Sequence, residues 1–241
     1  MNDCQLNPQL KRTFSYVGNE QIPVWVIDDF VTEPEHLVSI ACEIKGEIQA
    51  TTFHQQASDF YPGIRKASPK IYGDLLTELS PWFKEVVQYS TFNRVTPVMS
   101  AFSIATTPES KLRPIQMLPH FDTPANEQLA VVHYLCEPSH GGTSLYRHKA
   151  SGYERITIDR VTDYQVQLKQ QAVAEQLHLT PSYINGSTAL FEQIHCIEAK
   201  FNRAVIYPSN ALHSGNINTK IPLSSHPATG RLTVSSFISL S

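Results

Sequence analysis

The sequence has few cysteines and no long apolar run. The four cysteines, Cys4, Cys42, Cys136 and Cys196, are far apart and form no C-x-x-C pair, which argues against a zinc ribbon or a dithiol redox motif. Scattered thiols suit a reducing compartment, so we expect a cytoplasmic protein. The sequence contains neither an apolar signal core near its start nor the roughly 18 consecutive apolar residues of a membrane helix.

Charge of either sign is also scarce. Charged residues make up 17% of the chain, with 19 basic and 22 acidic residues, a net charge of -3 and no long run of like charge. We therefore expect neither a nucleic acid nor a membrane surface as a partner. The apolar fraction of 41% is sufficient for a sizeable core, and we expect all 241 residues to form a single domain.

The chain up to about residue 92 is predicted to be a helix-rich N-terminal support. Thr32 is a candidate helix N-cap, and Pro34 suits a first helical turn. Pro81 is expected to split a later helical region, because proline removes a hydrogen bond inside a helix. The predicted elements are strands at 12–18 and 22–27, a helix from 32 to 48, a loop over 51–64 and a helical region over 69–90.

Residues 93–241 are dominated by short strand-like runs separated by Pro, Gly, Asn and Ser. Such a succession favours a β-sandwich or jelly roll with the early helices packed outside. One Gln- and Ala-rich interruption, near 159–178, has a helical period. The predicted strands are 98–105, 112–118, 129–136, 143–147, 187–194, 204–207 and 231–240.

The triplet His120-Phe121-Asp122 is the first candidate for chemistry. In an extended segment, side chains at i and i+2 leave the same face, so His120 and Asp122 would project together. A lone His-x-Asp is weak evidence in a chain with ten histidines. His213, in a loop directly after the apolar strand at 202–208, could supply the second imidazole of a 2-His-1-carboxylate triad for Fe(II).

The last strand supplies a candidate anion site. Arg231 and Thr233 share one face of an extended strand. A buried guanidinium needs an anion, and its planar fork fits a carboxylate. Tyr134 and Gln116 could donate hydrogen bonds to the same small molecule, although buried polar groups require partners in any case.

These residues resemble the iron- and 2-oxoglutarate-dependent oxygenases. The run AVVHYL at 130–135, followed by Gly141-Gly142-Thr143, is similar to the prolyl-4-hydroxylase-like branch, and the wording PHFD resembles an uncharacterised bacterial subfamily. The resemblance implies a double-stranded β-helix of the jelly-roll or cupin type. It further implies an oxidoreductase that uses Fe(II), 2-oxoglutarate and O₂ to hydroxylate a substrate, with an amino acid or peptidyl residue as the expected class.

The resemblance assigns roles to individual residues. His120, Asp122 and His213 are the implied metal ligands, and Arg231 with Thr233 is the implied 2-oxoglutarate anchor. Arg231 lies farther from His213 than the branch's usual anchor does, so residues 219–229 are expected to be an inserted loop. Lys220, within that loop, is the rival anchor.

Two other functions and the role of one helix stay open. A cupin-like metal- or ligand-binding module would retain the barrel without oxidation, and a metal-dependent isomerase or hydrolase could use the same scaffold. The helix near 159–178 could be a lid, a substrate wall or the contact of a homodimer.

Overall fold

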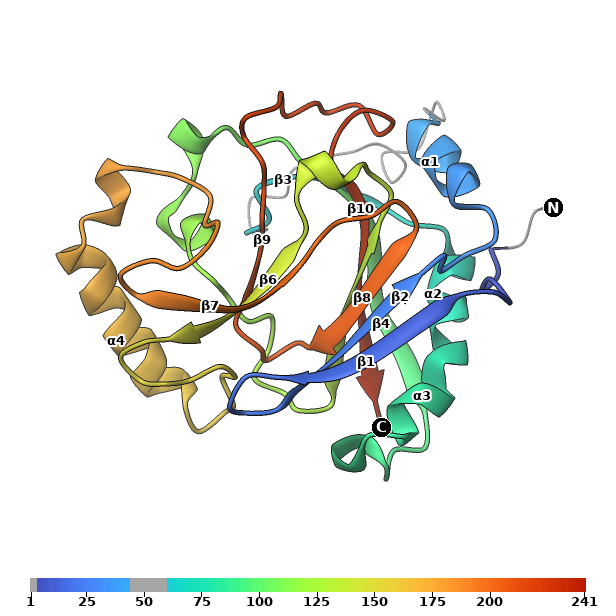
Figure 1. Cartoon of the computed structure of the whole chain (residues 1–241), viewed down its shortest axis with the longest axis horizontal. Helices are drawn as coiled ribbons and strands as arrows, with labels where there is room; N and C mark the ends of the chain where they lie inside the picture. The colour runs from blue at the N-terminus through green and yellow to red at the C-terminus, as the bar shows by residue number, and fades with distance from the viewer. Residues whose placement is uncertain (1–3, 44–59) are drawn as a thin grey trace.

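The computed structural model describes residues 4–43 and 60–241, which form two antiparallel sheets flanked by helices (Figure 1). The larger sheet has seven strands in the order β1-β2-β8-β5-β10-β4-β3, and the smaller has the order β7-β6-β9. The strands of the larger sheet are β1 (Lys11–Val17), β2 (Ile22–Asp28), β3 (Gly63–Ala67), β4 (Val95–Ala105), β5 (Gln128–Tyr134), β8 (Arg203–Pro208) and β10 (Leu232–Leu240).

The two faces of the larger sheet are covered differently. One face packs on α1 (Pro34–Cys42), α2 (Lys70–Leu76) and α3 (Ser80–Lys84), which lie together along one side of the molecule (Figure 1). The other face packs against the smaller sheet through a second apolar cluster that includes Leu145 and Ile197. Strand β10 divides its side chains accordingly, because alternate residues point to opposite faces.

The smaller sheet packs against a helix of its own. It consists of β6 (Thr143–His148), β7 (Phe191–Ile197) and β9 (His213–Gly215), and α4 (Val161–Ala174) lies beside it at the far end of the molecule (Figure 1). Tyr164 of α4 is buried with Tyr146 and Phe191 of this sheet. The predicted helix near 159–178 is therefore confirmed over most of its length.

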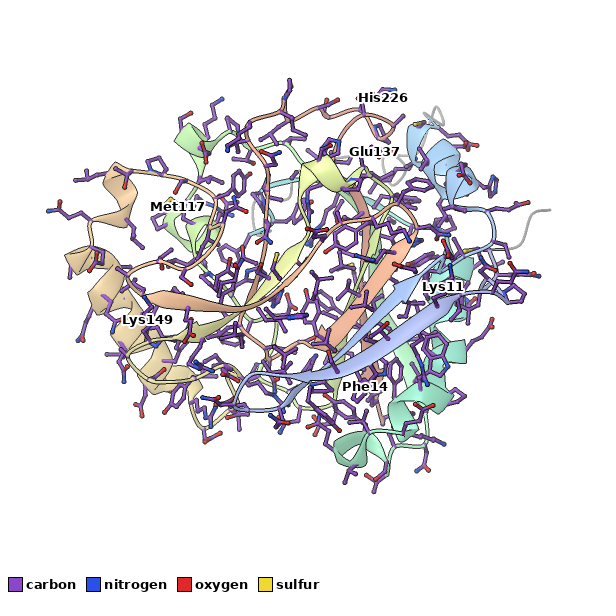
Figure 2. All side chains as sticks on the ribbon, in the orientation of Figure 1. Lys11, Phe14, Met117, Glu137, Lys149 and His226 are labelled. Atoms are coloured by element: carbon purple, nitrogen blue, oxygen red, sulfur yellow. The ribbon has the colours of Figure 1, made fainter. Side chains whose placement is uncertain are left out.

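The prediction of a strand at 112–118 is wrong. This segment contains the 3-10 helix η5 (Pro114–Met117), preceded by η4 (Glu109–Lys111). Pro114 has no N–H for a ladder, and the side chain of Gln116 accepts a hydrogen bond from the Arg113 N–H, so the segment bonds to itself. Met117, labelled in Figure 2, then packs with Leu112, Tyr183 and Ile217 instead of extending a sheet.

Three N-terminal predictions also need correction or limits. The α1 N-cap is Glu33 rather than Thr32. The predicted loop over 51–64 ends in β3, and residues 44–59, including the end of the predicted helix, lie outside the described residues. Gly63 permits β3 to form, because a Cβ there would meet the Ile104 backbone oxygen of β4.

The predicted break at Pro81 is confirmed. The 69–90 region is divided into α2, η2 (Thr77–Leu79), α3 and η3 (Val87–Tyr89), with Pro81 in the first turn of α3. Strand β7 begins later than predicted, at Phe191, because Thr188 closes a turn onto it. None of the helices among the described residues has both the length and the apolar character needed to cross a membrane.

Candidate metal centre

Three donor side chains converge at the open edge of the smaller sheet. One ligand atom from each of His120, Asp122 and His213 lies within 4.8 Å of the other two. The Asp122 carboxylate is 3.9 Å from His120 Nε2 and 3.6 Å from His213 Nε2. The structure thus brings together the three residues that the sequence proposed as metal ligands.

Backbone pairing holds the donors in place. The His120 N–H donates to the His213 carbonyl at 2.9 Å, and the His213 N–H donates back to the His120 carbonyl at 2.8 Å. The Asp122 N–H donates to the Ser209 carbonyl at 2.8 Å. His120 forms an isolated bridge with His213, the first residue of β9, rather than part of the extended strand that the i, i+2 argument assumed.

The orientation of His213 leaves one ring nitrogen for a ligand. Its Nδ1 lies 2.9 Å from the Ala211 carbonyl oxygen. A carbonyl only accepts, so Nδ1 carries the proton, and in the neutral ring Nε2 holds the lone pair. That lone pair faces the Asp122 carboxylate, and two acceptors at this separation are stabilised by a cation between them. Metal-binding histidines commonly donate their second ring N–H to a carbonyl in this way.

The surroundings of His120 and Asp122 favour metal binding. Burial lowers the pKa of His120 well below its usual value, helped by the neighbouring His213 and the charge of Arg65. About half of the His120 side chain, 49%, is accessible, so solvent moderates the effect of burial. A lowered pKa favours the neutral imidazole, which is the form that binds metal. Burial raises the Asp122 pKa, and His213 and Arg65 oppose that rise. The donor set fits a transition metal such as Fe(II).

Two adjoining chambers lie beside the donors and share part of their lining. An outer chamber of about 340 Å³ and an inner one of about 100 Å³ share Arg65, Arg231 and Phe237 as well as His120 and Asp122. The outer volume lies in the range of small-molecule sites. The side chains found only in the outer wall are mostly apolar or aromatic: Phe60, Pro62, Ile115, Gln116, Phe121, Tyr183, Ser214 and Ile217. Those found only in the inner wall include Thr143, Tyr207, Thr233 and Ser235.

Arg231 lies at the wall of both chambers, directly before β10. Its side chain is 5% exposed and donates to the carbonyls of Gly141, at 3.0 Å, and Gly142, at 2.8 Å. A Cβ at either glycine would collide with the backbone oxygen of Asn216 or Ile197, so only glycine permits this turn. The two carbonyls use two of the five guanidinium donors and orient the others. The sequence indicated these glycines only as part of the resemblance to the prolyl-4-hydroxylase-like branch and did not reveal their contact with Arg231.

The other predicted anion-site residues lie around Arg231 with different contacts. Thr233 lines the inner chamber, and its hydroxyl makes contacts of 3.5 Å with the Ser103 carbonyl and 3.3 Å with Ser235. Tyr134 is fully buried; its hydroxyl pairs with Thr143 at 2.6 Å, and Arg231 lies 5.7 Å from its ring. Gln116 lines the outer chamber and also donates to the Phe60 carbonyl. Lys220 is exposed and lines neither chamber.

Comparison with known proteins places the chain in a family. A family model described as a family of unknown function (DUF6445) matches residues 8–238. The chain belongs to this family. No curated protein sequence matches it. Among solved structures, the DUF6445 chain is similar to AviO1 from Streptomyces viridochromogenes Tue57, with 12% identity and a TM-score of 0.42 over 98% of this chain and 90% of that one. It is also similar to EvdMO1, with 10% identity and a TM-score of 0.38 over 97% and 56%.

Arg65 is a charged residue at the site of this DUF6445 chain that the sequence did not reveal. It lies on β3, opposite Ser103 of β4, which is in turn opposite Thr233 of β10. Directly opposed residues share a face of a sheet, so Arg65 belongs to the same row as Thr233. Its neighbour Lys66 points to the other face and donates to the Ile40 carbonyl at the end of α1. This alternation was the available signal, but the predicted loop over 51–64 covered the start of β3, and residues 65–67 were assigned to no element.

The helix α4 stands behind the site. Its Tyr164 ring lies 6.2 Å from the ring of Phe121, the residue between His120 and Asp122. Gln171 of α4 is hydrogen-bonded to His148 at 2.7 Å. None of its residues is among the described residues that line either chamber. Among the described residues, α4 therefore packs behind Phe121 and the smaller sheet without forming part of either chamber wall.

Proposed function

We propose that the chain is an Fe(II)- and 2-oxoglutarate-dependent dioxygenase that hydroxylates an as yet unidentified substrate, an amino acid or a peptidyl residue. The observation that carries the proposal is the His120, Asp122 and His213 donor set, with the His213 proton held by a carbonyl and its Nε2 directed at the carboxylate. We further propose that the two facing antiparallel sheets are a double-stranded β-helix, as in the prolyl-4-hydroxylase-like branch.

The three donors have distinct tasks in this proposal. His120 and His213 bind Fe(II) as neutral imidazoles, and Asp122 supplies the anionic ligand that favours a divalent cation. The bridge between His120 and His213 fixes the separation of their side chains before any metal arrives. When bound, Fe(II) with 2-oxoglutarate and O₂ supplies the oxidation of a substrate C–H bond.

The inner chamber is proposed to receive the 2-oxo acid. Arg231 directs its remaining donors at the far carboxylate, and the Thr233 hydroxyl lines the same wall. A guanidinium already fixed by two carbonyls loses little freedom when it binds an anion. Tyr134, through its ring below Arg231 and its hydroxyl bond to Thr143, keeps this end of the chamber in shape. Gln116 does the same at the outer wall.

Anaerobic spectroscopy tests the proposal. Fe(II) and then 2-oxoglutarate are added to the metal-free protein, and a weak visible metal-to-ligand charge-transfer band is expected. The band should be lost in His120→Ala and in Arg231→Ala, with iron binding retained in Arg231→Ala. His226→Ala is the matched control, because His226 is exposed and lies in the loop before Gly230 (Figure 2). It should leave the band unchanged.

Other outcomes favour other functions. A folded protein that binds iron and gives no band would favour the cupin-like binding module. Turnover that requires metal but not 2-oxoglutarate would favour an isomerase or hydrolase. If the band survives in Arg231→Ala, the anchor lies elsewhere.

A further inference from the structure

Tyr207 has a buried hydroxyl that the proposed function does not use. It lies on β8, is 1% exposed, and lines the inner chamber but not the outer one. Its hydroxyl forms no hydrogen bond with any residue in 4–43 or 60–241, and its oxygen keeps some accessible surface, whereas the unpaired hydroxyl of Tyr164 is sealed. A buried hydroxyl without a partner is costly, and phenylalanine would avoid that cost. The Tyr207 hydroxyl is therefore expected to bind a partner that enters the chamber.

Other hydroxyl groups in the same wall are paired within the protein. The Thr143 hydroxyl lies 2.6 Å from that of Tyr134, and the Ser236 hydroxyl lies 2.7 Å from that of Ser100. These pairs satisfy each other and need no ligand. Tyr207 differs from them, because it presents to the inner chamber a hydroxyl that no described neighbour occupies.

The strands beside Tyr207 leave room for such a partner. Tyr207 of β8 is directly opposite Ala130 of β5, which is in turn directly opposite Phe237 of β10. Directly opposed residues share a face of a sheet, and all three line the inner chamber. The row thus places a single methyl group between two large rings. The space above Ala130 is open to a small molecule that can reach the Tyr207 side chain.

Tyr207 lies on the metal side of the inner chamber. The centre of its ring is 4.8 Å from that of His213. Burial raises the pKa of Tyr207 well above its usual value, and the charge of Asp122 raises it further, whereas that of Arg231 has a smaller, opposing effect. The hydroxyl therefore keeps its proton and is a hydrogen-bond donor. It is a donor close to the three metal-binding side chains, and Arg231 is a second donor in the same chamber.

We propose that the Tyr207 hydroxyl donates a hydrogen bond to the metal-binding end of the 2-oxo acid, while Arg231 binds the far carboxylate. This inference rests on the proposed function, since it adds a contact to the 2-oxo acid of the same site. The keto and carboxylate oxygens at that end are acceptors, which suits a protonated hydroxyl. Because Tyr207 lines only the inner chamber, it binds the 2-oxo acid and not the substrate in the outer chamber.

Tyr207→Phe tests the inference, because it removes only the hydroxyl. Anaerobic protein containing Fe(II) is titrated with 2-oxoglutarate, and the charge-transfer band reports both affinity and band position. The affinity should fall by about tenfold to a hundredfold, the range for one hydrogen bond to a charged group. The band should move to shorter wavelength, since a hydrogen bond to the keto acid lowers the energy of the orbital that accepts the electron. Fe(II) affinity should not change, and the ligand-free variant should melt no lower than the wild type.

Tyr89→Phe is the matched control, because Tyr89 is buried in the larger apolar cluster and lines neither chamber. It should change neither affinity nor band. If Tyr207→Phe does not fold, Tyr207→Leu takes its place, as an apolar side chain suits the cluster around this position.

Two failures are distinguishable. A wild-type band that keeps its position and its 2-oxoglutarate dependence in Tyr207→Phe would overturn this inference alone and leave the proposed function intact. An absent band in the wild-type protein would overturn the proposed function, and the inference with it. A lower melting temperature of ligand-free Tyr207→Phe with an unmoved band would also overturn the inference, because the hydroxyl would then have only a structural role.

Discussion

The two faces of the seven-stranded sheet differ: one packs in the apolar core and the other lines the chambers beside the candidate metal centre. On the face toward α1, α2 and α3, β10 places Leu232, Val234 and Ile238, all fully buried in the larger apolar cluster. On the other face it places Thr233, Ser235 and Phe237, which line the inner chamber. The core residues and most of the chamber-lining residues of β10 therefore occupy alternate positions, although Ser236 also lines the chamber.

A pair of histidines shows the same contrast. His133, on the helix side of β5, has both ring nitrogens occupied: Nε2 lies 3.1 Å from the Asn202 amide oxygen, to which it donates, and Nδ1 accepts from the Tyr72 hydroxyl at 3.1 Å. His213 has one nitrogen held by a carbonyl and the other directed at Asp122. A histidine with both nitrogens paired within the core is a structural group, and one with a free lone pair in a cavity is a candidate ligand.

Replacing one phenylalanine on each face with alanine should give the largest difference in the free energy of unfolding between the two faces. Phe102 is fully buried on the helix side of β4, whereas Phe237 is half-buried at the chamber wall. Phe102→Ala should lower the free energy of unfolding by about 3–5 kcal/mol, because it leaves a closed cavity. Phe237→Ala should lower it by less than half as much, since water already reaches the site. Urea denaturation of both variants measures the difference, and equal losses would remove the distinction between the faces.

Removing Asp122 should separate metal binding from stability. Asp122→Ala loses a ligand, so the affinity for Fe(II) or Mn(II) should fall by more than the roughly 100-fold seen when only an outer hydrogen bond to a ligand is lost. Burial raises the Asp122 pKa, which means that folding disfavours its charged form. The metal-free variant should therefore be at least as stable as the wild type. Calorimetric metal titration and thermal melting give both values.

The control for Asp122→Ala is Asp163→Ala, because Asp163 is exposed in the first turn of α4. It should leave metal affinity unchanged. If Asp122→Ala retained metal affinity, the three-donor centre would be refuted. If Asp122→Ala strongly destabilised the metal-free protein, Asp122 would have a structural role like that of His133.

The free energy of unfolding should depend on pH through His133, which lies on the face of the sheet that packs against the helices. Burial lowers the pKa of His133 from 6.5 to about 4. The unfolded chain then binds the proton more tightly, so stability is full above about pH 6.5 and declines as pH falls toward 4, by about 3 kcal/mol for this group. Unfolding free energies across that range, compared between wild type and His133→Gln, isolate its contribution. A difference independent of pH would show that His133 titrates normally in the fold.

The sequence was sufficient to propose the three donor residues, but not the strand pairing and neighbouring residues that surround them. His120, Asp122 and His213 could be proposed from residue type and spacing, because few side chains bind iron and the histidine follows a recognisable strand. The geometric reason was only partly correct, since His120 is held by a bridge to β9 rather than by a strand of its own. Which strand lies beside which is a long-range property, and no local period encodes it.

The two misread segments have physical causes. The apolar residues of 112–118 suggested a strand, yet Pro114 and the Gln116 side chain, which accepts from the Arg113 N–H, favour a 3-10 turn. Strand β3 was not predicted, because it is short and begins at Gly63, directly after Tyr61-Pro62 and inside the predicted loop over 51–64. Its pairing to β4 depends on the close backbone approach that Gly63 permits. Arg65 was missed with it, since a single arginine has no pattern until the sheet places it.

The smallest effect should come from the rival anchor of the 2-oxo acid. Lys220 is exposed in the loop after β9, and only its backbone has a described hydrogen bond, to the side chain of Asn218. Surface substitutions of this kind change stability by no more than about 0.5 kcal/mol. Lys220→Ala should therefore leave the melting temperature and any affinity for 2-oxoglutarate unchanged, whereas the proposed function requires that Arg231→Ala abolish the charge-transfer band. The same anaerobic titration compares the two variants. Loss of the band in Lys220→Ala, together with its survival in Arg231→Ala, would assign the anchor to Lys220 in the loop. Arg231 would then have only a structural role, in which its hydrogen bonds to the Gly141 and Gly142 carbonyls hold this turn against the start of β10.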